Sequence, residues 1–278
     1  MNRSLHLLLA LILPLLITLP AWAQDNEAEA AAEQTPPPSI TAAAGTESLL
    51  DQQVADNEKV WLPVAGSSEL AFYLSEASGK THGGVILLPG IAQHPATKDS
   101  TINTLRIALS ENHWHTLALN IGDADKDKAL ALITAGVNYL HQQGVYNIAI
   151  LGEGLGAAQA IHYADSIASI NGASSQFAPI RAVVMIDADN VLPDSKKSTL
   201  QTLSMIGVPI LDAYSNSDYQ KQRLANERKR AARKKINRGY QQIRLPKTSV
   251  ARQDVDNRMT KRIRGWLDKN VAELRVDR

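Results

Sequence analysis

The chain has 278 residues, no cysteine and two phenylalanines, and its 29 Lys and Arg residues nearly balance its 28 Asp and Glu residues. An apolar fraction of 44% is enough for a globular core, and the length allows one large domain or two small ones. The balanced charge gives no indication of nucleic-acid binding. The lack of cysteine excludes disulfides, thiolate nucleophiles and cysteine-ligated metal sites.

Residues 1–23 have the pattern of a secretory signal peptide. Arg3 supplies a positive start, residues 7–19 form an apolar run, and Ala21-Trp22-Ala23 fits the small-x-small cleavage pattern. A retained membrane anchor is the alternative, but the run is short for a span of about 20 residues. We therefore expect cleavage before Gln24 and export to the periplasm.

Residues 24–58 are rich in Ala, Glu, Gln and Pro and show no sustained apolar period. This composition predicts a disordered linker outside the fold. The folded unit is expected to span residues 59–278, a length that suits one α/β domain.

Within residues 59–278, short apolar runs alternate with helical patterns. The predicted strands are residues 60–64, 70–74, 84–89, 116–121, 147–151, 181–186, 208–213 and 241–245. The predicted helices are residues 99–112, 125–143, 155–170, 221–235 and 256–274. Such alternation indicates an α/β fold with a mostly parallel sheet of about eight strands and helices on both faces.

The most specific segment is Gly152-Glu153-Gly154-Leu155-Gly156, which lies between a predicted strand and a predicted helix. The order strand, Gly-x-Ser-x-Gly, helix is the nucleophile elbow of α/β-hydrolases. Here the central residue is Gly154, which has no side chain to attack a carbonyl. Two other interpretations remain open, a degenerate dinucleotide-binding loop and a tight turn with no chemistry.

The blocks 84–95, 105–109, 114–119 and 151–156 together resemble the DUF3530 family of exported bacterial proteins, which are related to the α/β-hydrolase superfamily and have no assigned function. The resemblance extends from about Leu70 to the C-terminus. It implies an α/β-hydrolase-like fold and does not supply a substrate.

In that fold the chain order is nucleophile, acid, histidine. The predicted strand over 208–213 leads to Asp218 at the acid position, with Asp212 as the fallback, although Asp218 would also serve as a helix cap. The histidine should follow Leu245, but no histidine occurs after His162. Since the nucleophile and the base are both missing, a Ser–His proton relay cannot operate.

Other residues near the predicted elbow remain candidates for a site. Gly90 and Ile91 match the loop that carries the oxyanion hole, and His94 follows them. We expect His94 to be structural, with its imidazole bonded to loop backbone, and we keep a role in the site as the alternative. Glu153 is the candidate for a lone acid.

No cofactor or metal is predicted. The carboxylates Asp123, Asp125 and Asp127 follow a strand, but they lack the glycine and the distal glutamate of a calcium loop. A solvated loop and a helix cap are the simpler interpretation of these three residues.

The segment 221–235 is strongly basic and rich in helix formers. A solvated surface helix is the plain interpretation. The functional alternative is contact with anionic lipid, lipopolysaccharide or an acidic protein. From Tyr219 to Arg278 the chain has 19 Lys and Arg residues against six Asp and Glu residues, so the balanced total hides an uneven distribution.

The sequence therefore predicts an exported protein with a degenerate catalytic triad. The favoured function is a non-catalytic binding or envelope-associated protein. The alternative is a hydrolase with non-standard catalytic residues that acts on a small ester or amide.

Overall fold

We describe the protein from a computed structural model, in which residues 48–121, 124–171, 179–193, 195–215, 218–233, 239–245 and 256–272 are described. The chain divides into two units, residues 1–40 and residues 41–278, and every described residue belongs to the second unit. The predicted signal peptide, residues 1–23, and most of the predicted linker lie outside the described residues. None of the helices in the described part combines the length and the apolar composition needed to cross a membrane.

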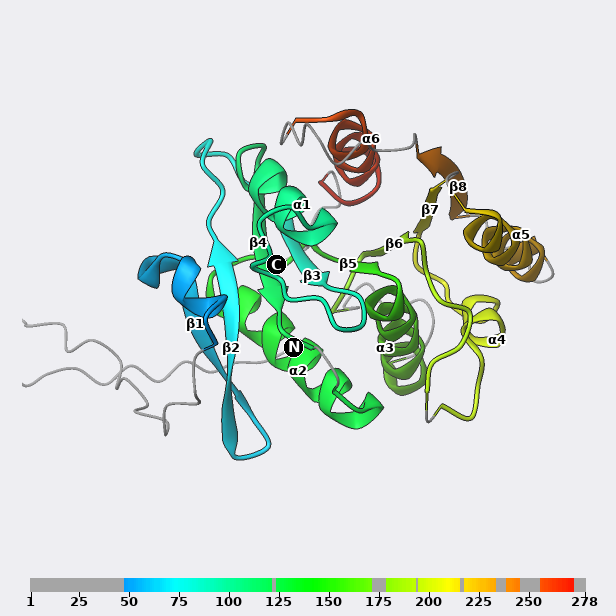
Figure 1. Ribbon diagram of the computed structural model, residues 1–278, viewed down its shortest axis with the longest axis horizontal. Helices are drawn as coiled ribbons and strands as arrows, with labels where there is room; N and C mark the ends of the chain where they lie inside the picture. The colour runs from blue at the N-terminus through cyan, green and yellow to red at the C-terminus, as the bar shows by residue number, and fades with distance from the viewer. Residues whose placement is uncertain are drawn as a thin grey trace, which may run out of the picture. The chain divides into compact units, whose positions relative to one another are not determined.

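One eight-stranded sheet forms the centre of the second unit, with the strand order β1-β2-β4-β3-β5-β6-β7-β8 (Figure 1). The strands are β1 Lys59–Val64, β2 Ser67–Leu74, β3 Gly83–Leu88, β4 Trp114–Leu119, β5 Ile148–Glu153, β6 Ala182–Ile186, β7 Ile210–Ser215 and β8 Tyr240–Leu245. The pairs β1–β2 and β2–β4 are antiparallel, and the remaining pairs are parallel. The predicted fold class is confirmed.

The α-helices are α1 Thr101–Ser110, α2 Lys126–Gln142, α3 Leu155–Asn171, α4 Thr199–Leu203, α5 Tyr219–Arg233 and α6 Arg258–Leu267. Polar side chains start several of them, since Ser100 accepts from Asn103 N–H and Asp125 accepts from Lys128 N–H. A short π-helical segment, η3, continues α6 over Asp268–Ala272. The described residues end at residue 272, so the predicted helix end at residue 274 lies outside them.

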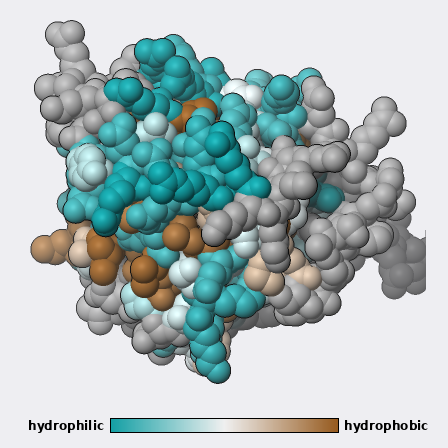
Figure 2. All heavy atoms as spheres, turned by 90° about the vertical axis from the view of Figure 1, so that its right-hand side faces the viewer, coloured by the Kyte–Doolittle hydropathy of each residue, from teal (hydrophilic) through white to brown (hydrophobic). Residues whose placement is uncertain are grey.

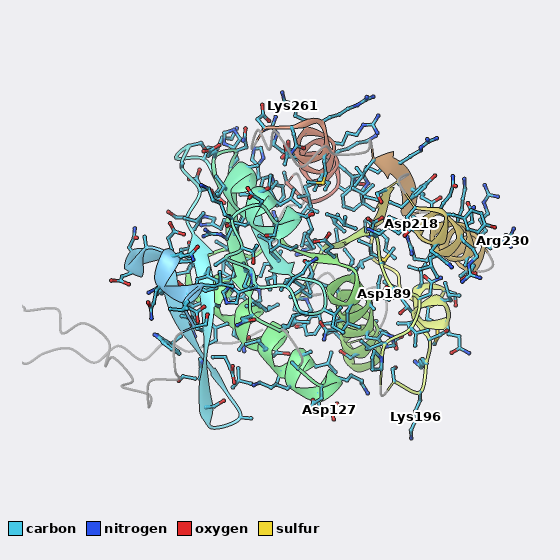
Figure 3. The ribbon with its side chains drawn as sticks, in the orientation of Figure 1. Asp127, Asp189, Lys196, Asp218, Arg230 and Lys261 are labelled. Atoms are coloured by element: carbon cyan, nitrogen blue, oxygen red, sulfur yellow. The ribbon has the colours of Figure 1, made fainter. Side chains whose placement is uncertain are left out.

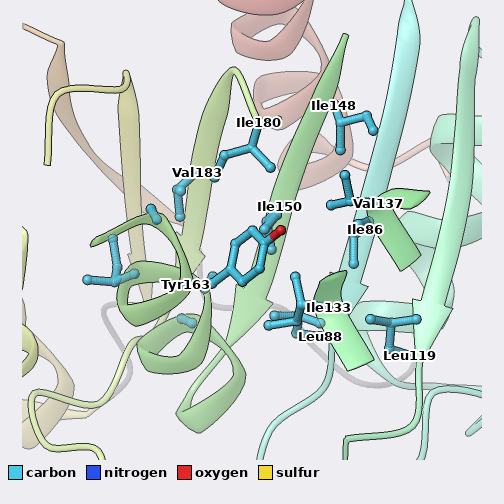
Figure 4. Packing of buried hydrophobic residues seen from close by; sticks show 14 of the residues in the cluster. Ile86, Leu88, Leu119, Ile133, Val137, Ile148, Ile150, Tyr163, Ile180 and Val183 are labelled. Atoms are coloured by element: carbon cyan, nitrogen blue, oxygen red, sulfur yellow. The ribbon is translucent and has the colours of Figure 1, made fainter. Parts of the chain in front are cut away.

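Two hydrophobic clusters cover the two faces of the sheet. β3 is buried along its whole length and contributes to both clusters, because alternate side chains of a strand point to opposite faces. Ile86 and Leu88 belong to the cluster that includes α2 and α3, where Figure 4 shows them near Tyr163 of α3. Val85 and Leu87 belong to the cluster that includes α1 and α6.

The ordered domain begins earlier than the predicted boundary at Lys59. Residues Asp51–Gln53 and Asp56–Glu58 form short 3-10 helices, η1 and η2. Asp51 and Val54 are buried, and Glu58 forms an ion pair with Arg106 of α1 at 2.5 Å. Because Glu58 and Arg106 are 48 residues apart in the chain, no local pattern in the sequence indicates this contact.

Candidate functional site

The predicted elbow is a sharp turn between β5 and α3. β5 ends at Glu153, α3 begins at Leu155, and the single residue between them, Gly154, has φ +54°. Gly154 N–H donates to the carbonyl of Ile186 at 2.9 Å, which ties the turn to the neighbouring strand β6. The local geometry is therefore strand, left-handed turn residue, helix, as in the elbow of α/β-hydrolases.

The flanking glycines are required by close backbone contacts. A Cβ atom at Gly152 would lie 2.4 Å from the nitrogen of Ala157, and one at Gly156 would lie 2.5 Å from the carbonyl oxygen of Leu88. Gly154 differs, because the nearest atoms to a Cβ there would be Asp189 Oδ2 at 3.7 Å and the Cα of Gly90 at 3.9 Å. The turn has room for a side chain at the nucleophile position, but the residue there supplies none.

The loop after β3 lies beside this turn, as the sequence predicts. Gly90 N–H donates to the Gln93 side chain at 3.3 Å, so a side chain of the same loop already occupies this backbone donor. Ile91 is 64% exposed and its neighbour Ala92 has φ +54°. The loop presents backbone next to Gly154, but the Gly90 donor is not free for a ligand oxygen.

His94 faces the N-terminal segment of the domain. Its Nε2 lies 2.9 Å from Asp51 Oδ1, and its Nδ1 accepts from Ala96 N–H at 3.2 Å. Phe72 packs edge-on against the ring. Both ring nitrogens face protein groups, so the expected structural role, with the imidazole bonded to loop backbone, describes its contacts. The acidic partner was missed, because Asp51 falls in the predicted linker.

Neither candidate for the triad acid faces the elbow as a free carboxylate. Asp218 is exposed and accepts from Gln220 N–H at 2.7 Å, which is the bond of a helix cap at the start of α5. Asp212 is fully buried in β7, where Arg228 of α5 binds both of its oxygens at 2.9 and 3.0 Å. Residues 216–217 and the segment after β8, residues 246–255, lie outside the described residues.

Three carboxyl groups that the sequence does not bring together lie around the turn. Glu153 ends β5, and Asp187 and Asp189 follow the neighbouring strand β6. The carboxyl ends of adjacent parallel strands meet at one edge of a sheet. Carboxylates that directly follow two neighbouring predicted strands could therefore have indicated this cluster from the sequence. Lys221 of α5 donates to Asp187 at 2.7 Å, and Ser215 N–H donates to the other oxygen of Asp187 at 2.6 Å.

Burial changes the ionisation of this cluster. It raises the pKa of Glu153, which Asp187 raises further, although a hydrogen bond from the Thr101 hydroxyl at 3.2 Å works in the opposite direction. The second oxygen of Glu153 has no hydrogen-bond partner among the described residues. Burial also raises the pKa of Asp189, against the fields of Arg228 and Lys221.

Lys221 has a raised pKa for a different reason. Burial alone would lower it, but the bond from its ammonium group to Asp187 and the fields of Glu153 and Asp218 outweigh burial. The cluster thus combines Lys221, whose pKa is raised, with Glu153 and Asp189, whose pKa values are also raised. Figure 3 labels Asp189 and Asp218, which lie at different places along this edge of the fold.

Replacing Glu153 by glutamine should change how stability depends on pH. A carboxyl whose pKa is higher in the folded state than in the unfolded chain favours folding at low pH. This contribution is lost as pH rises from the ordinary glutamate pKa of about 4.3 through the raised folded-state pKa. We therefore expect Glu153→Gln to match the wild type near pH 4 and to be more stable near pH 8, by about 1.4 kcal/mol for each unit of pKa difference.

Urea unfolding of both proteins between pH 4 and pH 8 measures this difference. Glu111→Gln, at an exposed position just after α1, is the matched control and should show no such trend. An equal stability difference at both pH values would contradict a raised folded-state pKa of Glu153.

No group of three or more histidine and carboxylate side chains in the described ranges is arranged to hold a metal ion. Of the three aspartates considered for calcium, Asp123 lies outside the described residues and Asp125 caps α2.

The strand order and the elbow between β5 and α3 define the α/β-hydrolase fold. Solved structures agree. Est1E from Butyrivibrio proteoclasticus matches with 13% identity and a TM-score of 0.57 over 78% of this chain and 100% of its own. Esterase Pf2001 from Pyrococcus furiosus matches with 15% identity and a TM-score of 0.58 over 82% and 95% of the two chains. The dienelactone hydrolase from Anabaena variabilis matches with 12% identity and a TM-score of 0.59 over 77% and 97%.

Identities this low show the shared fold and nothing further. The family is established by a different comparison, since the family model described as "Protein of unknown function (DUF3530)" matches residues 4–132 and 122–269. The chain belongs to the DUF3530 family, and the predicted resemblance is confirmed. A search of curated proteins finds no match to this sequence.

Proposed function

We propose that this protein is an exported, non-catalytic member of the α/β-hydrolase fold that binds a ligand or partner in the periplasm. The observation that carries the proposal is Gly154, which leaves the nucleophile position without a reactive atom while the backbone around it keeps the form of an elbow. Two further observations support it. The sequence has no histidine after His162, and the ring nitrogens of His94 face Asp51 and Ala96.

The first test is covalent labelling by a fluorophosphonate probe of serine hydrolases. We expect no labelling of the wild-type protein, whereas an active esterase labelled in parallel reacts fully. Stoichiometric labelling of one residue would overturn the proposal, because it would reveal an activated nucleophile at another position.

Restoring the serine should not restore hydrolysis. Gly154→Ser places a hydroxyl where a Cβ has only ordinary contacts, so the variant should fold. Without a histidine to remove its proton, the hydroxyl stays a weak nucleophile. We expect no turnover of p-nitrophenyl esters above the wild-type background, and clear turnover would mean that a base exists near the elbow.

A second function is favoured by one observation, the raised pKa of Glu153 beside the turn. A buried carboxyl with a raised pKa and one oxygen without a hydrogen-bond partner among the described residues is suited to donate a proton to a leaving group, as in a hydrolase with non-standard residues. A screen of small esters and amides tests this alternative. Turnover lost in Glu153→Gln and retained in His94→Ala would support it, and no turnover by the wild type would remove it.

A further inference from the structure

Helix α5 presents two faces of different character. Its inward face carries Ala225, Arg228 and Ala232, which are buried at helical spacing. The opposite face carries four exposed cations, Arg223, Lys229, Arg230 and Arg233. Figure 3 labels Arg230 on the outer side of α5, at the edge of the molecule.

These outward cations, which we call the α5 basic face, are held on a fixed helix. Arg228 is 1% exposed and binds Asp212 of β7, the carbonyl oxygen of Ala188 and the side chain of Asn190. This network joins the inward side of α5 to the sheet. The α5 basic face is therefore a rigid surface, so binding does not require the ordering of a flexible segment to bring its charges together.

The charges of the α5 basic face are not neutralised within the described part of the chain. Arg223 lies 4.0 Å from Glu227, an exposed contact of the kind that contributes little. No carboxylate of the described residues forms an ion pair with Lys229, Arg230 or Arg233. A surface with this excess of cations attracts an anionic partner.

Exposed apolar side chains lie on or near helix α5. Tyr219 opens α5 and is 78% exposed, and Val191 is 68% exposed. Val191 lies close to the helix, because the side-chain amide of its neighbour Asn190 donates to the carbonyl of Leu224 and to Glu227. Met205, 49% exposed, follows α4, which packs against α5. Figure 2 shows the face on the right-hand side of Figure 1, where hydrophobic side chains gather beside mostly hydrophilic ones.

We propose that the α5 basic face docks on a bilayer containing anionic phospholipid. Guanidinium groups bind phosphate through paired hydrogen bonds, and each basic residue near an anionic bilayer strengthens the attraction. Cations alone would also suit an acidic protein. The exposed valine, methionine and tyrosine favour a lipid surface, since such side chains enter the layer between headgroups and acyl chains.

Vesicle sedimentation of the chain from Gln24 onward, the predicted mature form, tests the proposal. We expect recovery with vesicles that contain phosphatidylglycerol, little recovery with phosphatidylcholine alone, and loss of binding as salt rises. The variant Arg223→Gln/Arg230→Gln/Arg233→Gln should bind anionic vesicles more weakly by on the order of a hundredfold. Val191→Ser/Met205→Ser should weaken binding further at high salt, where the apolar contribution dominates.

The matched control is Lys80→Gln/Lys98→Gln/Lys128→Gln, which removes three exposed positive charges elsewhere on the domain and should bind like the wild type. Unfolding midpoints of both triple variants should stay close to that of the wild type, since all six side chains are exposed and the ion pairs Arg223–Glu227 and Lys128–Glu69 are surface contacts that contribute little. Equal recovery with neutral and anionic vesicles, or full binding by the arginine variant, would overturn the proposal. Binding to polyglutamate without binding to vesicles would also overturn it and would identify an acidic protein as the partner. These outcomes do not depend on whether the elbow is catalytic.

Discussion

Replacing Asp212 by alanine is expected to destabilise the fold by about 3 to 5 kcal/mol, because the change leaves the buried Arg228 guanidinium without its counter-ion. Asp212 also accepts from the Tyr240 hydroxyl at 2.5 Å and from the Gln242 amide at 2.9 Å, so these two donors lose a partner as well. The free energy of unfolding in urea measures the loss.

A double variant separates the pair from its parts. Asp212→Leu/Arg228→Met replaces both charges by apolar side chains, and such exchanges of buried ion pairs are often neutral or stabilising. We expect most of the stability lost in Asp212→Ala to be recovered. If the double variant were as unstable as the single one, the attraction within the ion pair would have to exceed the free-energy cost of removing both charges from water. The packing of α5 on β7 would then depend directly on this ion pair.

An exposed arginine of the same helix provides the control. Arg223→Ala removes a guanidinium that lies 4.0 Å from Glu227 on the surface, and we expect a change within about 0.5 kcal/mol. A large loss for Arg223→Ala would contradict the division of α5 into a structural inward face and a free basic face.

The role of Asp212 could not be predicted from the sequence. It was the fallback for the triad acid because it lies in the strand that precedes the acid position. Its actual role depends on Arg228, Tyr240 and Gln242, which are 16 to 30 residues away in the chain. Contacts of this kind are set by how helix α5 and strand β8 return to β7, and no local pattern records that arrangement.

The fold was more predictable than the site, because the burial of a strand or helix produces a recognisable local pattern of apolar residues. β3 reads as a continuous apolar run since both of its faces are covered, and α2 carries its apolar residues at helical spacing. α4 has only five residues and was not predicted, because so short a segment completes little more than one helical period. β4 begins at Trp114, two residues earlier than predicted, where the aromatic side chain is fully buried.

The contact between His94 and Asp51, like the contacts of Asp212, joins residues that are far apart in the chain. The composition of residues 24–58 is that of a linker, and composition cannot show that its last part packs onto the domain. Asp51 lies 43 positions before His94 in the printed sequence, and only the folded chain brings the two side chains to 2.9 Å. Both ring nitrogens of His94 therefore face protein groups.

The glycines of the elbow allow a second prediction with a large effect. Gly152→Ala and Gly156→Ala each place a Cβ atom 2.4 to 2.5 Å from backbone atoms of the turn or of the β3 end. Backbone on both sides of the contact cannot move aside as a flexible side chain does. We expect each variant to lose about 3 kcal/mol or more in urea unfolding, at or above the upper end of the usual cost of overpacking.

Gly154→Ala is the matched comparison within the same turn. Its Cβ would meet no atom closer than 3.7 Å, so the cost is that of a left-handed conformation at φ +54°, about 1 to 2 kcal/mol. Equal losses at all three positions would contradict this account. The predicted stability losses, larger at Gly152 and Gly156 than at Gly154, separate two requirements that the motif combines in active hydrolases, close backbone packing and a catalytic side chain. Gly152 and Gly156 are required by the packing of β5, α3 and the β3 end. Packing leaves room for a side chain at Gly154, where only the left-handed backbone conformation favours glycine. The outer glycines are therefore evidence for the fold, and the motif by itself is not evidence for hydrolysis.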